Sequence, residues 1–305
     1  MKPRYFVLSL LLTTGMLATA CSGGGGQEDS GIGDADADAG SDGGDQQPAD
    51  DGGLDAGDEV GDEGGDQGGD EQATACELDY ECPAGQVCRS GFCEPFEAEC
   101  EGDDDCAGEQ VCRDQLCVDA DQSPLSGLLI FNEVLIDGNT DGDPNGDGSR
   151  DGVEDEFIEL VNVSNRTLDL GDFTLVETDW DIYLPRHTFA AGTQLEPLDA
   201  IVVFGGGDPP DSTDSVLYLV ANAQDPGTAY GLDLDDEGDH LRLLDADGWT
   251  VAGFAYGDEG GNQAVSDESA TRDPDLTGDF TPHSQAQGAQ DAIFSPGSRV
   301  DGNAF

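Results

Sequence analysis

Apolar residues divide the chain into three parts: a short apolar start, a long polar stretch and a region of many short apolar runs. The runs in the last part, residues 125–305, are 128–136, 157–163, 173–176, 200–204, 216–220, 241–244 and 251–255. Turn residues such as Gly171-Asp172 and those at 191–193 and 245–248 separate them. No run shows sustained helical periodicity. The pattern therefore predicts an all-β sandwich over residues 125–305.

The apolar start is typical of a secretory signal. Residues 1–4 carry two basic side chains, residues 5–12 are apolar, and Leu17-Ala18-Thr19-Ala20 stands before Cys21. The segment is too short to be a spanning helix. With a cysteine at the junction, residues 1–21 resemble the lipobox of bacterial lipoproteins, although that family prefers Leu where Ala18 stands.

The resemblance implies that residues 1–20 are removed and that Cys21 becomes a lipidated N-terminus, carrying palmitate or a similar chain. The protein would then be anchored to the bacterial cell envelope, at the outer membrane, outside the cytoplasm. The alternative is a plain signal peptide cleaved nearby, with Cys21 as a spare thiol.

The polar stretch from Ser22 to Ala75 consists mainly of Gly, Asp, Glu, Gln, Ala and Ser, with no basic or aromatic residue. It cannot bury enough apolar surface to offset the entropy of ordering, so we expect it to be disordered. Together with Cys21 it would form a tether, residues 21–75, between the membrane and the folded part. Low-complexity filler without a selected length is the alternative.

The charge narrows the range of partners. The chain of 305 residues has a formal net charge of -58, and Lys2 is its only lysine. Nucleic acids are excluded as partners, because binding a phosphate backbone requires arrays of Lys and Arg. Cations are the natural ligands, and the remaining partner would be a protein or glycan at the cell surface. Solubility, salt tolerance or calcium buffering at the envelope would also account for such a charge.

A repeat with a period of 24 residues occupies residues 76–118. Each of its units, 76–93 and 100–117, has four cysteines with the same spacing; these are Cys76, Cys82, Cys88, Cys93, Cys100, Cys106, Cys112 and Cys117. A unit this small needs two disulfides in place of a core, and four cysteines allow three pairings. Zinc is the alternative, but Cys-x2-Cys spacing and a nearby histidine are missing. If these eight cysteines pair with one another, Cys21 is the cysteine that has no thiol partner.

The two units resemble the short cysteine-rich modules of extracellular proteins, such as the Dickkopf N-terminal type. The following region resembles bacterial lamin-tail domains through residues 131–134, 155–162, 168–175, 243–248, 271–275 and 295–297. The second resemblance implies an immunoglobulin-like β-sandwich that binds or scaffolds and is not an enzyme.

Residues 143–154 match the calcium loop of EF-hands at every constrained position. The predicted oxygen ligands are Asp143, Asn145, Asp147, the carbonyl of Ser149, Asp151 and Glu154. Gly148 would permit the sharp turn, and strands flank the loop in place of helices. Calcium would order the loop and lock the first two strands in register. Asp155 and Glu156 also stand where an acid could close the site, and a solvated acidic loop is the alternative.

Sequence motifs of catalysis are missing. His187, His240 and His283 stand in no pattern with a nucleophile or a second metal-binding histidine. We expect His283 to be structural and Arg272-Asp273 to form an ion pair. The sequence thus favours a surface-anchored, non-catalytic binding or structural module, with an accessory module of a hydrolase, or an undetected extracellular hydrolase, as the alternative.

Overall fold

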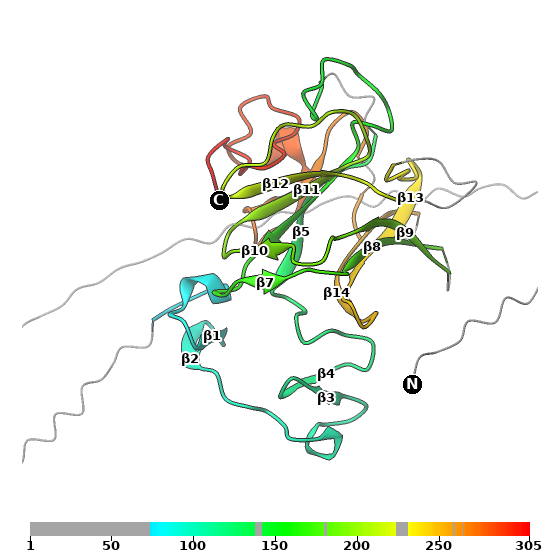
Figure 1. Cartoon of the computed structure of the whole chain (residues 1–305). Helices are drawn as coiled ribbons and strands as arrows, with labels where there is room; N and C mark the ends of the chain where they lie inside the picture. Colours follow the sequence, from blue (N-terminus) through cyan, green and yellow to red (C-terminus); the bar gives the residue numbers. More distant parts are fainter. Residues whose placement is uncertain (1–73, 138–141, 180–181, 224–230, 259, 264) are drawn as a thin grey trace, which may run out of the picture. The chain divides into compact units, whose positions relative to one another are not determined.

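The computed structural model describes residues 74–137, 142–179, 182–223, 231–258, 260–263 and 265–305 (Figure 1). These residues lie in one compact unit, Gln67–Phe305. The predicted signal segment, Cys21 and nearly all of the predicted tether lie outside the described residues. Within those residues, no helix has the length and apolar character needed to cross a bilayer.

Two larger sheets form the sandwich (Figure 1). The six-stranded sheet has the order β12 (Val216–Val220), β11 (Ala200–Phe204), β6 (Phe157–Asn162), β5 (Leu129–Leu135), β15 (Ala270–Asp273) and β16 (Asp279–Pro282). The four-stranded sheet has the order β14 (Thr250–Gly257), β13 (Gly238–Leu244), β8 (Thr174–Asp179) and β9 (Ile182–Thr188). A short pair joins β7 (Leu168–Asp169) to β10 (Gln194–Leu195). Among the strands of the described residues, only β11 and β12 are paired in parallel.

The main core lies between the two sheets. Leu129, Phe131 and Leu160 contribute from the six-stranded sheet, and Leu243 and Phe254 contribute from the other. The rings of Phe131 and Phe254 stack across the interface with centroids 6.2 Å apart. The described chain contains no α-helix, only 3-10 turns such as η3 (His283–Gln285). The predicted all-β sandwich is confirmed.

The six-stranded sheet is also covered on its outer face. A second apolar cluster there contains residues from β5, β6, β11 and β12, with Leu276 and Phe294 from the C-terminal segment packed on it. Every residue of β6 and β11 is buried as a result. Burial on both faces explains why these strands read as continuous apolar runs and not as alternating ones.

Each outer strand of the two sheets contains a proline or a carbonyl that a residue outside the strand already occupies. β9 contains Pro185, and β16 ends in Pro282, neither of which has an N–H to donate. Along β12, Thr213 donates its N–H to the carbonyl of Val216. Along β14, Asn262 donates its N–H to the carbonyl of Ala255.

Each predicted apolar run contains a strand, but several strands were not predicted. These are the short pair β7 and β10 together with β9, β15 and β16. β9 has the sequence IYLPRHT and β15 has ATRD, so neither gives an apolar run. Both are fixed by pairing with neighbours, β9 with β8 and β15 with β5 and β16.

The two cysteine units have the same local fold. Each contains a 3-10 turn followed by a hairpin: η1 (Asp79–Glu81), β1 (Gln86–Arg89) and β2 (Phe92–Pro95) in the first, and η2 (Asp103–Asp105), β3 (Val111–Arg113) and β4 (Leu116–Val118) in the second. The two-residue hairpin turns, Ser90-Gly91 and Asp114-Gln115, have positive φ at both positions. This geometry suits the twist of a tight hairpin.

Candidate functional site

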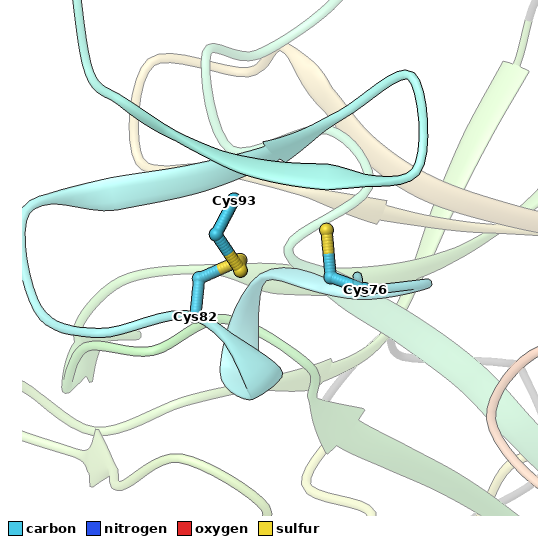
Figure 2. A group of neighbouring side chains, drawn as sticks. All are labelled: Cys76, Cys82 and Cys93. Atoms are coloured by element: carbon cyan, nitrogen blue, oxygen red, sulfur yellow. A yellow bond between two sulfur atoms is a disulfide. The ribbon is translucent and has the colours of Figure 1, made fainter. Parts of the chain in front are cut away.

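All eight cysteines of the repeat form disulfides. The first pairs with the third and the second with the fourth in each unit: Cys76–Cys88, Cys82–Cys93, Cys100–Cys112 and Cys106–Cys117. Three sulfur atoms of each unit lie within 4.8 Å of one another. Figure 2 shows the three cysteines of the first unit, Cys76, Cys82 and Cys93. Since each sulfur belongs to a disulfide, none is a thiolate that could bind zinc. The predicted disulfides are confirmed.

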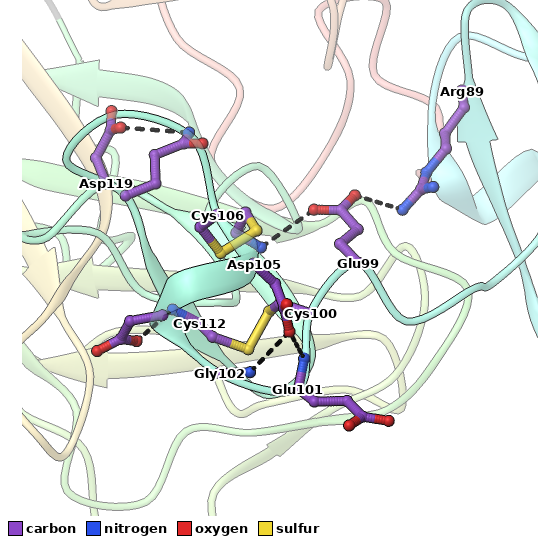
Figure 3. The surroundings of a disulfide bond; sticks show 12 residues. Arg89, Glu99, Cys100, Glu101, Gly102, Asp105, Cys106, Cys112 and Asp119 are labelled. Carbon is purple, nitrogen blue, oxygen red and sulfur yellow. Dashed lines mark hydrogen bonds and ion pairs between the residues drawn. A yellow bond between two sulfur atoms is a disulfide. The ribbon is translucent and has the colours of Figure 1, made fainter.

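Carboxylates complete each cysteine unit. Asp79 accepts the N–H of Cys88 at 2.7 Å, and Asp103, 24 residues later, accepts the N–H of Cys112 at 2.8 Å. Asp105 accepts the N–H groups of Glu101 and Gly102 in front of η2 (Figure 3). These acids satisfy backbone donors that a unit without a core cannot bury in regular structure.

The acidic loop between β5 and β6 is folded back on itself through its first acids. Asp143 accepts the N–H of Gly148 at 2.8 Å, and Asn145 accepts the N–H of Asp147 at 3.0 Å. Asp147 in turn accepts the N–H of Ser149 at 2.7 Å. The predicted ligands at positions one, three and five therefore each accept a backbone N–H of the loop.

The predicted ligands at positions nine and twelve are arranged differently. Asp151 is exposed and accepts the N–H groups of Val153 and Glu154, which hold the pKa of its carboxyl below the usual range. The side chain of Glu154 is exposed and lies against Gly206. Ser149 is exposed as well.

Asp155 is the buried acid of this loop, with an exposed fraction of 0%. Its Oδ2 accepts the N–H of Asp151 at 2.8 Å, whereas its Oδ1 has no hydrogen-bond partner. Burial raises the pKa of Asp155 above its usual value, the N–H of Asp151 opposes this, and the charges of Asp143 and Asp147 raise the pKa further. Among the described residues, however, no three acids each bring an oxygen within 4.8 Å of the other two.

Three glycines after β11 support the loop. Gly205 donates its N–H to the carbonyl of Glu156, and Gly206 donates to the carbonyl of Glu154. A Cβ on Gly207, which has φ +75°, would lie 2.4 Å from Asn145 Nδ2 and 2.7 Å from Asp147 Oδ2. Only glycine leaves room for the loop here.

Glu156 does not belong to the loop. It is buried, and its Oε2 accepts the N–H of Leu234 at 3.3 Å. Burial raises the pKa of Glu156 to about 9. Of the three successive acids that could close a cation site, Asp155 is the one that accepts an N–H from within the loop.

A layer of buried polar residues was not predicted from the sequence. Glu133 and Glu159 lie opposite each other on β5 and β6, each with an exposed fraction of 0%. Glu133 accepts the N–H of Ser295 at 2.8 Å, and Glu159 accepts the N–H of Gly297, so both carboxylates hold the C-terminal segment. Burial raises the pKa of both groups, most strongly that of Glu159, where the charge of Glu133 adds to the effect.

His283 is part of the same layer and has an exposed fraction of 0%. Its Nδ1 lies 3.0 Å from the carbonyl of Ala292, and its Nε2 lies 2.9 Å from Ser295 Oγ. Glu133 contacts the hydroxyl of Ser295, not the Nδ1 of His283. The contacts therefore differ from those of a hydrolytic triad, where the acid orients the imidazole through Nδ1.

Arg272 is not paired with Asp273, so that prediction was wrong. Among the described residues, no ion pair within 4.0 Å joins these two side chains. The guanidinium donates to the carbonyls of Phe131 and Gly278, both at 2.7 Å, and lies over the ring of Phe280. Arg272 still fastens the C-terminal region, but through backbone carbonyls of the strands and turn beside it.

These features define a class of protein: an immunoglobulin-like β-sandwich preceded by two disulfide-stapled units. Residues 122–258 match the family model of the lamin tail domain. Residues 75–119, the cysteine units, match a domain of unknown function, DUF7107. A search of curated proteins finds no match for the chain.

The lamin tail domain is an immunoglobulin-like module that binds or supports other structures. The family match ends at Asp258, whereas β15 and β16 complete the six-stranded sheet beyond it. The Dickkopf-type resemblance of the cysteine units stays a prediction.

Proposed function

We propose that this chain is a lipid-anchored, non-catalytic binding or structural module of the bacterial cell envelope, stabilised by calcium. In this proposal Cys21 carries the lipid at the outer membrane, and residues 22–75 form the tether. The sandwich, on its two cysteine units, would meet a protein or glycan at the cell surface.

The observation that carries the proposal is the use of cysteines. The chain has nine, and four disulfides within residues 76–117 account for eight of them. Cys21 therefore has no intramolecular partner left, and it stands at the junction of a signal-like segment. Disulfides are also typical of proteins outside the cytoplasm, which agrees with export.

Metabolic labelling with palmitate tests the anchor. We expect the full chain expressed in a Gram-negative host to incorporate label and to sediment with membranes. The Cys21→Ser variant should lose both properties, while Cys76→Ser/Cys88→Ser, which removes a disulfide, should keep them. An unlabelled wild-type chain in the soluble fraction would contradict the proposed anchor.

Binding and catalysis are separated by two further measurements. The full chain in detergent, used as bait in envelope extract, should retain a partner that a chain lacking residues 122–305 does not retain. The same preparation should not hydrolyse nuclease, phosphatase or glycosidase substrates. Turnover that disappears on substitution of His283 or of a loop aspartate would support the hydrolase alternative instead.

A further inference from the structure

We propose that the acidic loop binds one divalent cation of the calcium type through Asp143, Asn145, Asp147 and Asp155, and not through Asp151 or Glu154. This inference rests on the calcium-stabilised loop of the proposed function and names its ligands. It replaces the ligand set that the spacing of an EF-hand loop predicts.

The two unpartnered carboxylate oxygens of the loop carry the inference. Asp155 Oδ1 and Asp143 Oδ1 are both shielded from solvent, and neither has a hydrogen-bond partner. A buried carboxylate oxygen without a donor is costly, because it has lost water and gained nothing in return. Both oxygens accept only, so a donor or a cation is what each requires.

The surroundings of these oxygens are rich in negative charge. Asp143 and Asp147 are two further carboxylates of this loop, and Asp155 is hydrogen-bonded to its backbone at Asp151. Like charges held at short range repel one another unless a cation stands between them. Among the described acids, no three bring oxygens within 4.8 Å of one another. We expect the cation to draw the three carboxylates together by a small movement of the loop.

The chemistry of the ligands favours calcium. Carboxylate and amide oxygens are hard ligands, and calcium accepts about six to eight of them in flexible geometry. Asn145 is buried at 1% exposure and its amide lies 3.4 Å from the carbonyl of Glu154, so it stands inside the loop beside the acids. Backbone carbonyls and water would complete the shell. Magnesium requires a near-ideal octahedron, which a loop with these spacings does not offer.

Asp151 and Glu154 differ from Asn145 and Asp155 in being exposed. The Oδ1 of Asp151 already accepts two backbone N–H groups, and Glu154 lies against Gly206. The backbone at Glu154 and Glu156 is held by Gly206 and Gly205, respectively. Of Glu154, Asp155 and Glu156, Asp155 is the acid that accepts an N–H from within the loop, that of Asp151 at 2.8 Å.

Calorimetric titration of the full chain with calcium chloride, in detergent, tests the assignment. We expect Asp155→Asn to lower the affinity of the strongest site at least 10-fold, since the amide keeps the shape and one acceptor but loses the charge. Glu154→Gln and Asp151→Asn are matched controls that each remove one neighbouring charge. They should change the affinity less than 2-fold. Weak binding to the acidic residues 22–75 should be equal in all variants.

Thermal unfolding separates ligation from a structural role. In EDTA, Asp155→Asn should melt at the same temperature as the wild type or higher, because a buried unpaired charge has been removed. In calcium the order should reverse, with only the wild type gaining stability. Asp143→Asn provides the same reversal through the second unpartnered oxygen, should Asp155→Asn fail to fold.

Three results would overturn the inference. A larger loss in Glu154→Gln than in Asp155→Asn would restore the EF-hand ligands. Equal binding by all variants would place calcium elsewhere. An Asp155→Asn protein less stable than wild type in both EDTA and calcium would make Asp155 purely structural. None of these outcomes depends on palmitate labelling at Cys21, so the proposed anchor stands or fails separately.

Discussion

The two cysteine units have the same disulfide framework but use the side chains between the cysteines differently. Asp79 and Asp103 accept equivalent backbone N–H groups, and both units have the same disulfide pairing. In the first unit, Leu78 and Tyr80 pack on the outer apolar cluster of the six-stranded sheet. The equivalent residues 24 positions later are Gly102 and Asp104, which have no apolar surface to bury.

Hydrogen bonds also join the first cysteine unit to the sandwich. In the first unit the N–H of Tyr80 donates to the carbonyl of Val163 at 3.0 Å, and Asn165 donates to the carbonyl of Gln86 at 2.8 Å. Cysteines and capping acids thus build a unit, whereas a few residues between them decide how it contacts the sandwich. A duplicated module can keep its fold while one copy gains or loses a docking surface.

The largest effect should come from removing one disulfide in each unit. Cys82→Ala/Cys93→Ala and Cys106→Ala/Cys117→Ala each open a loop with a sequence separation of 11, for a loss of about 3 kcal/mol within the unit. The first pair should lower the melting temperature of the sandwich more than the second, because Leu78 and Tyr80 of the first unit pack on its outer apolar cluster. Differential scanning calorimetry checks this, and equal effects on the sandwich would break the comparison.

Tyr80→Ala should cost about 2 kcal/mol, since it removes a partly buried aromatic ring from the sheet. Asp104→Ala, the equivalent change in the second unit, should stay within about 0.5 kcal/mol. Chemical denaturation followed by near-UV circular dichroism measures both. If Asp104→Ala costs as much as Tyr80→Ala, the second unit has a docking role that its sequence does not indicate.

A smaller contrast separates the equivalent arginines. Arg113 donates to the carbonyls of Asp119, Ala120 and Gln122 and lies 3.7 Å from the ring centre of Trp249. Arg113→Ala should therefore cost about 1–2 kcal/mol. The fluorescence of Trp249 should change with it at low denaturant. Arg113→Lys is the control, as it keeps the charge but loses the planar donors, and it should recover only part of the loss.

The smallest effect belongs to Arg89, the equivalent residue in the first unit. It forms an ion pair with Glu99 at 2.7 Å, and both side chains are more than a third exposed (Figure 3). Arg89→Ala should cost no more than about 0.5 kcal/mol, and 0.5 M sodium chloride should remove most of that. If Arg89→Ala costs as much stability as Arg113→Ala, the contribution of these arginines depends on their place in the unit and not on the groups that they contact.

The sequence predicted the sandwich well where apolar residues were continuous. Strands β11 and β12 begin and end where the runs at 200–204 and 216–220 do. Polar strands such as β15 were missed because pairing with β5 and β16 fixes them, and no local pattern records such pairing. The disulfide pairing was likewise open, since spacing alone allows three arrangements.

Buried acids were the harder part of the site to predict. Spacing can group Asp143, Asn145 and Asp147, because they lie within a few residues of one another. It leaves open whether Glu154, Asp155 or Glu156 closes the loop, since the backbone there is held by Gly205 and Gly206, about 50 residues away in the sequence. In the same way, the sequence does not show that Glu133 and Glu159 are buried, because their burial depends on the C-terminal segment that covers them.

The prolines and paired carbonyls of the outer strands affect how neighbouring copies of the chain can pair with one another. An open edge strand invites a second copy to add its own strand, which leads to fusion and aggregation at high local concentration. Here Pro185 and Pro282 interrupt two outer strands, while Thr213 and Asn262 occupy acceptors on the other two. Copies held side by side on a membrane, as proposed, would thus meet as separate bodies. Any contact between them would then be made by side chains on their surfaces and not by pairing of edge strands.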